Sequence, residues 1–284
     1  MGSSERDAVV VGVLALQGAF NEHVQLLRQA AQILATENMI QRRWTFKEVR
    51  TEAELKSCDA LIIPGGESTA ISLVAQRSNM LEPLRDFVKV TRKPTWGTCA
   101  GLILLAESAN RTKKGGQELI GGLDVRVNRN HFGRQIESFE ANLDLPFLKQ
   151  VDGENADANQ APFRAIFIRA PIVERLLPTV SGIQAGEAKV DDTVIAPART
   201  IDQDVAKTMN LGHVEIMGTL PGDAPANKDD AAKEKLEVEA GDIVAVRQAN
   251  VFGTSFHPEL TGDPRIHVWW LEQVIEALDR RRNL

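Results

Sequence analysis

A cysteine flanked by glycines is the first candidate for chemistry in this 284-residue sequence. Cys99 lies in the stretch Gly97-Thr98-Cys99-Ala100-Gly101, between a short apolar run and an apolar segment of helical character. Small neighbours let the backbone turn sharply and raise the side chain above a sheet, as in a nucleophile elbow. The positive end of the following helix would favour the thiolate. The context therefore favours a nucleophile at Cys99 over a buried packing thiol, the usual role of a single cysteine and the one expected for Cys58.

A thiol nucleophile needs a base, and His257 has the best setting among the five histidines. It stands in Ser255-Phe256-His257-Pro258-Glu259, directly after an apolar run at 251–255. Pro258 keeps the residue before it extended, and a carboxylate two residues on can fix the tautomer of the imidazole. We therefore predict Cys99, His257 and Glu259 as nucleophile, base and orienting acid. The competing interpretation is a solvent-exposed histidine at a strand end.

The remaining histidines have weaker settings. His23 and His267 fall in predicted helices and His213 in a polar segment, so we expect surface or packing roles for them. His131 follows an Arg-Asn pair in a loop and is a weaker candidate base.

A second glycine-rich turn, Pro64-Gly65-Gly66-Glu67-Ser68, follows the apolar run 60–63. Such a sequence makes a tight turn anywhere, which is its simplest interpretation. Its position after a buried strand and before a helix also allows its amides to face a developing negative charge. We therefore predict that Gly65 and Gly66, together with the amide of Ala100, line an oxyanion hole.

Strand and helix patterns alternate in the first part of the chain. We predict strands at 9–16, 44–49, 60–63 and 94–96, and helices at 21–35, 68–76, 81–90 and 100–106. Alternation with short connections is typical of an α/β fold with three layers and a doubly wound, mostly parallel sheet. Ligands of such sheets bind outside the carboxyl ends of the strands, where both glycine-rich turns fall.

The second part has a different pattern. Short strands are predicted at 123–127, 138–140, 165–168, 243–248 and 251–255 without intervening helices, which indicates an antiparallel extension. A final helix follows Pro264. The segment 177–241 is polar and punctuated by Pro and Gly, so we interpret it as a polar surface insertion on one domain spanning 1–284.

Composition excludes several classes of function. The net charge of −6 argues against a general nucleic-acid or anionic-membrane surface, and no apolar run approaches the length of a membrane span. The chain contains no tyrosine, so tyrosine acid–base chemistry is excluded. Two cysteines and an N-terminus without a secretory signal predict a cytoplasmic protein. We find no zinc-type Cys/His cluster and no P-loop, and therefore expect no metal and no cofactor.

Several motifs together resemble one family. GVLALQGAFNEH, PGGEST, GTCAGLILLA, RNHFGRQIESFE, FIRAP and TSFHPELTGD occur in this order. They are similar to the glutaminase subunits of pyridoxal 5′-phosphate synthase, which belong to the class I, or triad, glutamine amidotransferases. GTCAG and HPE alone indicate only the broad class, whereas the other motifs are more specific. The resemblance covers 9–172 and 243–278.

The resemblance implies a flavodoxin-like fold and a division of roles. Cys99 would attack the side-chain amide of L-glutamine, giving a thioester and ammonia, with His257 as base and then acid. The residues implied to hold glutamine are Gly66, Glu67, Ser68, Arg129, Ile168, Arg169 and Gln17, of which Gln17 would lie near the oxyanion hole and the partner interface. Arginine forks suit a carboxylate, although surface salt bridges would also explain both arginines.

The implied partner is a synthase subunit with a (β/α)₈ barrel, which would use the ammonia to make pyridoxal 5′-phosphate. The chain itself would bind no pyridoxal phosphate. Three alternatives stay open from the sequence: a glutaminase serving another acceptor pathway, a hydrolase cutting γ-glutamyl or peptide bonds, and a non-catalytic regulatory subunit on the same fold.

Overall fold

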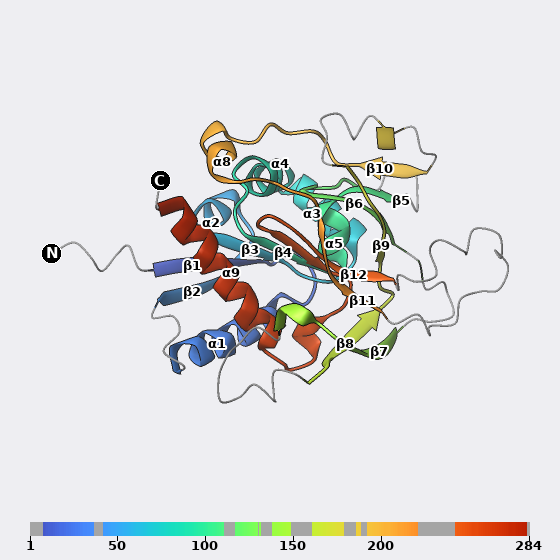
Figure 1. Ribbon diagram of the computed structural model, residues 1–284. Helices are drawn as coiled ribbons and strands as arrows, with labels where there is room; N and C mark the ends of the chain where they lie inside the picture. Colours follow the sequence, from blue (N-terminus) through green and yellow to red (C-terminus); the bar gives the residue numbers. More distant parts are fainter. Residues whose placement is uncertain are drawn as a thin grey trace.

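The structure is a computed structural model that describes residues 8–36, 42–110, 117–129, 131, 138–148, 161–178, 186–188, 192–220 and 242–282. A large twisted sheet crosses the molecule, with helices on both of its faces (Figure 1). The helices are α1 (Phe20–Thr36), α2 (Glu52–Lys56), α3 (Ser68–Arg77), α4 (Leu81–Arg85), α5 (Ala100–Leu105), α8 (Gln203–Thr208) and α9 (Arg265–Arg282). The helix predicted over 81–90 is divided, because α4 continues as a π-helical turn, Asp86–Val90.

One half of the sheet is entirely parallel. Its strands are β1 (Ala8–Leu14), β2 (Arg43–Val49), β3 (Ala60–Ile63), β4 (Thr95–Thr98) and β13 (Val251–Thr254). They lie in the order β2-β1-β3-β4-β13, and each neighbouring pair is parallel. The register aligns Ile63 with Gly97 and Thr98 with Thr254, so the carboxyl ends of β3, β4 and β13 are level.

The other half carries the antiparallel extension. It contains β12 (Ile243–Gln248), β9 (Ile172–Leu176), β6 (Leu123–Asn128), β5 (Ala106–Asn110), β10 (Thr193–Ile195) and β11 (Glu215–Thr219). β5 and β6 are parallel, whereas the other pairs in this half are antiparallel. Strands β7 (Ser138–Leu143) and β8 (Phe163–Ile168) form a separate antiparallel pair. Strands β5, β9, β10 and β11 were not predicted from the sequence.

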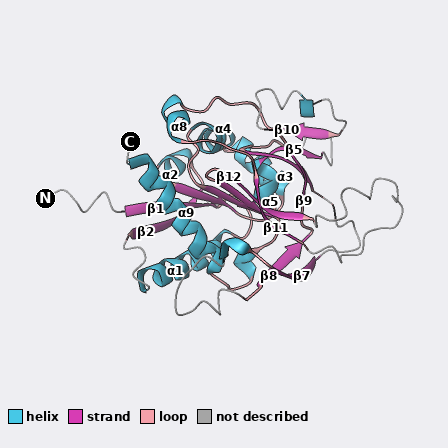
Figure 2. Cartoon of the chain, viewed as in Figure 1, coloured by secondary structure: helices cyan, strands magenta, loops and turns pink. Residues whose placement is uncertain are grey.

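Two hydrophobic cores separate the three layers, which confirms the predicted fold class. One core lies between the sheet and α3, α4 and α5, and the other between the sheet and α1 and α9 (Figure 2). The second core contains Trp96 from β4 and Trp270 from α9, whose rings are 5.8 Å apart. Packing of α1 beside α9 brings residues far apart in sequence behind the carboxyl end of β4.

The predicted insertion contributes structure to the sheet in the parts that are described. β10 pairs with β5, and β11 pairs with β12. Glu187 is buried and forms ion pairs with Arg126 and Arg175. The amide of Leu220 donates to the carbonyl of Asp242 at 2.8 Å, so the chain on either side of 221–241 is in direct contact.

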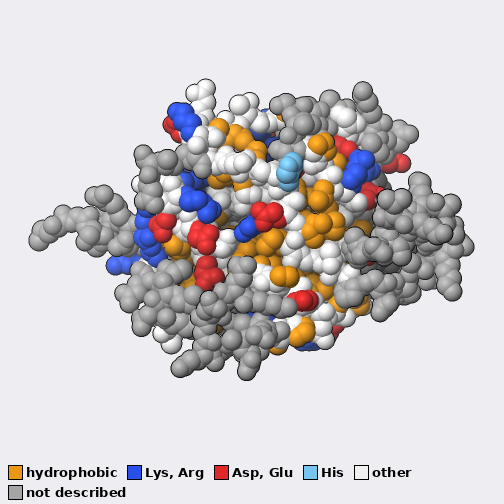
Figure 3. Space-filling view, viewed as in Figure 1, with side chains coloured by type: hydrophobic (Ala, Val, Ile, Leu, Met, Phe, Trp, Pro, Cys, Tyr) orange, Lys and Arg blue, Asp and Glu red, His pale blue; other side chains and the backbone are white. Residues whose placement is uncertain are grey.

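The surface is mixed in character. On the face shown in Figure 3, basic and acidic side chains lie among hydrophobic and uncharged ones. Within the described ranges, no helix combines the length and apolar character that a membrane span requires.

Candidate active site

The candidate site lies at the carboxyl ends of the parallel strands, as predicted. Gly65 follows β3 by two residues, Cys99 follows β4 directly, and His257 follows β13 by three. Because these strands are neighbours in register, the three positions meet above the same edge of the sheet. Gln17 comes from the end of β1, beside β3.

The backbone is turned sharply at Cys99. This residue precedes α5 with φ +47° and ψ −100°, a backbone conformation that residues other than glycine rarely adopt. Its amide donates to the carbonyl of Thr254 at 2.7 Å, which fixes the turn to β13. A Cβ placed on Gly97 would lie 2.6 Å from the carbonyl oxygen of Gly101. The two flanking glycines therefore permit the close strand-to-helix packing of a nucleophile elbow.

His257 is held between Cys99 and Glu259. Its Nδ1 lies 2.7 Å from Oε1 of Glu259, and its amide donates to the carbonyl of Ile166 in β8. Burial alone would lower the pKa of His257, but hydrogen bonding and charge from Cys99 and Glu259 outweigh burial and raise the pKa to about 10. The raised pKa favours an imidazolium at His257 at neutral pH.

Glu259 is buried and faces two imidazoles. Burial alone would raise its pKa, but His23 and His257 outweigh this effect and hold the pKa below its ordinary value. Glu259 therefore remains a carboxylate and can orient His257 through Nδ1.

The turn after β3 is packed closely against the imidazole. A Cβ on Gly65 would lie 2.7 Å from Nδ1 of His257 and 3.4 Å from the Cβ of Cys99. The carbonyl of Gly65 accepts from the amide of Ala19, and Oε1 of Gln17 accepts from the amide of Glu67 at 2.9 Å. These contacts fix the turn beside Cys99 and His257.

A cavity of about 350 Å³ opens above Cys99 and His257. Its lining includes every residue that the sequence analysis assigned to glutamine: Gln17, Gly66, Glu67, Ser68, Arg129, Ile168 and Arg169. Ile103, on α5, also lines it and was not predicted. Its apolar side chain next to Cys99 carried no recognisable signal in the sequence.

Two lining residues have structural contacts of their own. Glu67 caps α3 by accepting from the amides of Thr69 and Ala70, so part of the hydrogen-bonding capacity of its carboxylate is already used. Arg129 is buried, and its Nη2 lies 3.0 Å from Oγ of Ser68. Burial lowers the pKa of Arg129, opposed by the charge of Glu67. Arg129 is therefore built into the cavity wall and is not a surface salt bridge.

Among the other histidines and the second cysteine, only some contact the candidate site. His131 pairs with Asp242 at 3.2 Å, away from the cavity lining. Cys58 is buried, and burial raises the pKa of its thiol to about 11, as expected for a packing residue. His23 is not on the surface: it is completely buried, and its Nε2 lies 3.4 Å from Oε2 of Glu259. The sequence analysis missed this contact.

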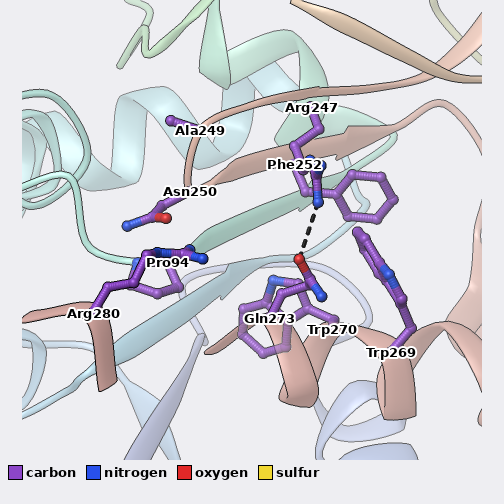
Figure 4. A pocket seen from close by; sticks show the side chains of 9 residues that line it. All are labelled: Pro94, Arg247, Ala249, Asn250, Phe252, Trp269, Trp270, Gln273 and Arg280. Atoms are coloured by element: carbon purple, nitrogen blue, oxygen red, sulfur yellow. Dashed lines mark hydrogen bonds between the residues drawn. The ribbon is translucent and has the colours of Figure 1, made fainter. Parts of the chain in front are cut away.

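A second hollow lies at the opposite ends of the strands (Figure 4). Its lining includes Pro94, Asn250 and Trp270, and a hydrogen bond of 3.0 Å joins Arg247 to Gln273 across it. Its volume of about 20 Å³ holds roughly one water molecule. Of these two cavities, only the one at Cys99 has the size and the polar side chains to hold an amino acid.

Comparison with known proteins gives a consistent result. The model of the SNO glutamine amidotransferase family matches residues 13–204 and 224–276. A probable pyridoxal 5′-phosphate synthase subunit PDX2 from Arabidopsis thaliana is 38% identical over 94% of this chain and 87% of its own length. A pyridoxal 5′-phosphate synthase subunit PdxT from Nocardia farcinica is 37% identical over 96% of this chain and 89% of its own.

A solved structure is also similar. A crystal structure described as a glutamine amidotransferase superposes with a TM-score of 0.58 at 33% identity, covering 93% of this chain and 98% of its own. The comparisons confirm the resemblance inferred from the motifs.

Proposed function

Because the chain belongs to the SNO glutamine amidotransferase family, we propose that it releases ammonia from L-glutamine at Cys99 for the synthesis of pyridoxal 5′-phosphate. The observation that carries the proposal is a cavity lined by a strained cysteine, by an imidazole that a buried carboxylate holds at Nδ1, and by residues suited to glutamine. The relatives named as pyridoxal 5′-phosphate synthase subunits support this pathway over another acceptor.

The geometry supports a thiolate–imidazolium mechanism. Sγ of Cys99 attacks the side-chain carbonyl carbon of glutamine, and a C–S bond forms while negative charge develops on the carbonyl oxygen. We assign the oxyanion hole to the amides of Gly65, Gly66 and Ala100, and one such donor typically contributes about 3 kcal/mol. His257 donates its proton to the amide nitrogen, the C–N bond breaks, and ammonia leaves.

The second half of the reaction uses the same groups in reverse. His257, now neutral, accepts a proton from water, and the resulting hydroxide attacks the thioester carbonyl. The C–S bond breaks, glutamate is released, and the thiolate–imidazolium pair is restored. Glu259 keeps the Nδ1 proton of His257 in place in both steps.

Substrate contacts follow from the cavity lining. Arg129 and Arg169 supply the positive charge for the α-carboxylate of glutamine, and Ile168 presents its backbone beside Cys99, with its carbonyl 3.9 Å from Sγ. Because Glu67 already caps α3, its contact with the α-amino group would use the remaining lone pairs of the same carboxylate.

The ammonia requires an acceptor protein. We propose that the chain docks on a synthase subunit with a (β/α)₈ barrel and that ammonia passes to it without entering bulk water. We also propose a cytoplasmic location and one domain, in which the polar segment near 177–241 is not wholly on the surface but adds β10 and β11 to the sheet.

The test is ammonia release from L-glutamine, measured with and without a synthase subunit. We expect weak release from the chain alone and a rise on addition of the synthase. Cys99→Ala should abolish release and leave complex formation intact. If Cys99→Ala released ammonia at the native rate, the proposed mechanism would be wrong; a rise with a different acceptor enzyme alone would reassign the pathway.

A further inference from the structure

A pair of buried histidines lies directly behind the candidate site. His23 comes from α1 and His267 from α9, the two helices packed side by side on one face of the sheet (Figure 1). Both side chains are completely buried, and Nδ1 of His23 lies 3.0 Å from Nε2 of His267. Trp96 encloses them, with its ring centroid 5.6 Å from that of His23 and 4.9 Å from that of His267. Burial of two imidazoles is costly unless their ring nitrogens find hydrogen-bond partners, so these contacts restrict where each proton lies.

His23 connects this pair to Glu259. Its Nε2 is in hydrogen-bond contact with Oγ1 of Thr98, the residue before Cys99, at 3.3 Å, and lies 3.4 Å from Oε2 of Glu259, a buried carboxylate oxygen with no hydrogen-bond partner among the described residues. The other carboxylate oxygen, Oε1, lies 2.7 Å from Nδ1 of His257. Glu259 therefore stands between two imidazoles, one on each oxygen.

The contacts select one tautomer for each histidine. Nδ1 of His267 is buried without a hydrogen-bond partner among the described residues. A bare nitrogen is tolerated there better than a buried N–H without an acceptor. His267 therefore carries its proton on Nε2 and donates to Nδ1 of His23. His23 must then carry its own proton on Nε2, the atom that faces the carboxylate of Glu259.

The pair is uncharged at neutral pH. Burial lowers the pKa of His23 to about 3; the charge of Glu259 opposes this effect, and His267 and His257 add to it. Burial lowers the pKa of His267 to about 3 as well. A neutral imidazole can donate a hydrogen bond to Glu259 without transferring its proton, so the carboxylate keeps the negative charge that it presents to His257.

We propose that His23 is a positioning residue for the glutaminase reaction: it donates Nε2–H to Oε2 of Glu259, while His267 fixes the tautomer of His23. The role rests on the function proposed above. With Oε2 held by α1, the plane of the carboxylate is set and Oε1 points at Nδ1 of His257. The two-helix layer thereby supports the base from the side opposite the substrate.

The groups that determine the charge of Glu259 come from several elements. His23 faces it from α1 and His257 from the loop after β13, and Thr98 of β4 adds a neutral hydroxyl near His23. His267 of α9 lies behind His23. Removing the donor at Nε2 of His23 leaves a buried carboxylate with less support, which raises the pKa of Glu259.

The test uses His23→Leu, which removes the donor, and His23→Gln, which can place an amide donor near the position of Nε2. We expect His23→Leu to lower kcat about 10- to 100-fold, as loss of an orienting contact does elsewhere, with KM for glutamine nearly unchanged. His23→Gln should recover most of this loss. His213→Gln, at an exposed histidine, is the control and should leave kcat unchanged.

A second readout does not depend on glutaminase activity. The rate of Cys99 alkylation by iodoacetamide, followed against pH in the isolated chain and assigned by peptide mass, reports the thiolate–imidazolium pair. We expect the acidic limb of this profile to move to higher pH in His23→Leu, because Glu259 becomes protonated earlier and releases His257. This profile tests the role of His23 even in a chain that releases no ammonia, so the two proposals can fail separately.

A second pair of variants keeps the test valid if His23→Leu has a folding defect. If His23→Leu does not fold, His23→Gln is compared with His23→Asn, whose shorter amide reaches only the position of Nδ1. We expect the Gln variant to keep the native profile and the Asn variant to lose it. An unchanged alkylation profile in folded His23→Leu, or equal rates and profiles in the Gln and Asn variants, would overturn the proposal.

Discussion

Crowding His257 from the turn after β3 should damage catalysis without removing any catalytic group. In Gly65→Ala, the new Cβ would lie 2.7 Å from Nδ1 of His257, whereas non-bonded atoms approach favourably to about 3.5 Å or more. The imidazole or the turn must therefore move by roughly 1 Å. His257 has little room to retreat, because its Nδ1 is bound to Glu259 and its amide to Ile166. A displacement of this size typically costs about 100-fold in rate.

The assay is kcat for ammonia release in the presence of the synthase subunit, together with thermal unfolding. Gly186→Ala is the matched control, because nothing lies within 4 Å of a Cβ at that position. Gly66→Ala is an intermediate case, since its Cβ would meet the movable end of Gln17 and, at 3.1 Å, the backbone Cα of Gly18. Gly65→Ala with at least half of the native kcat and a native melting temperature would refute the argument, because the amide remains and only crowding has been added.

Three further predictions concern the same structure. Activity, followed as kcat/KM against pH, should fall as pH rises through about 10, the pKa of His257. The raised pKa also stabilises the fold: this stabilisation is fully present below about pH 6.5 and should be lost between about pH 6.5 and 10, as urea unfolding against pH would measure. Arg129→Lys keeps the charge but loses the planar fork, so KM for glutamine should rise about 10-fold with kcat nearly unchanged in steady-state kinetics. Replacing 221–241 by Asn-Gly should keep native glutaminase activity and raise the free energy of unfolding in urea by up to ~2 kcal/mol, because Leu220 and Asp242 are already bonded and a shorter connection between them costs less entropy. A large loss of activity would show that the segment serves the site.

The parallel half of the fold and the elbow could be predicted because each signal is local. Cys99 with its glycines needs only a strand before it and a helix after it, and β3, β4 and β13 are apolar runs that end at recognisable turns. The meeting of these segments follows from the general rule for parallel sheets.

The missed elements depend on contacts between distant segments. β5 directly follows the apolar helix α5 and reads as its continuation; pairing with β6 and β10 makes it a strand. His23 has the spacing of an ordinary helical residue, and only the packing of α1 against α9 brings it to Glu259. No periodicity in the sequence reports a contact between residues separated by more than two hundred positions.

The backbone at Cys99 has a consequence for the evolution of stability in this chain. A non-glycine residue at φ +47° and ψ −100° carries conformational strain of about 1–3 kcal/mol, which the surrounding packing must offset. Glycine would release that strain and lose the nucleophile with it. An inactive Cys99→Gly chain should therefore outlast the active one on heating, so selection for thermal endurance alone would favour loss of the thiol. The cysteine persists in such a conformation only while its chemistry is useful to the cell.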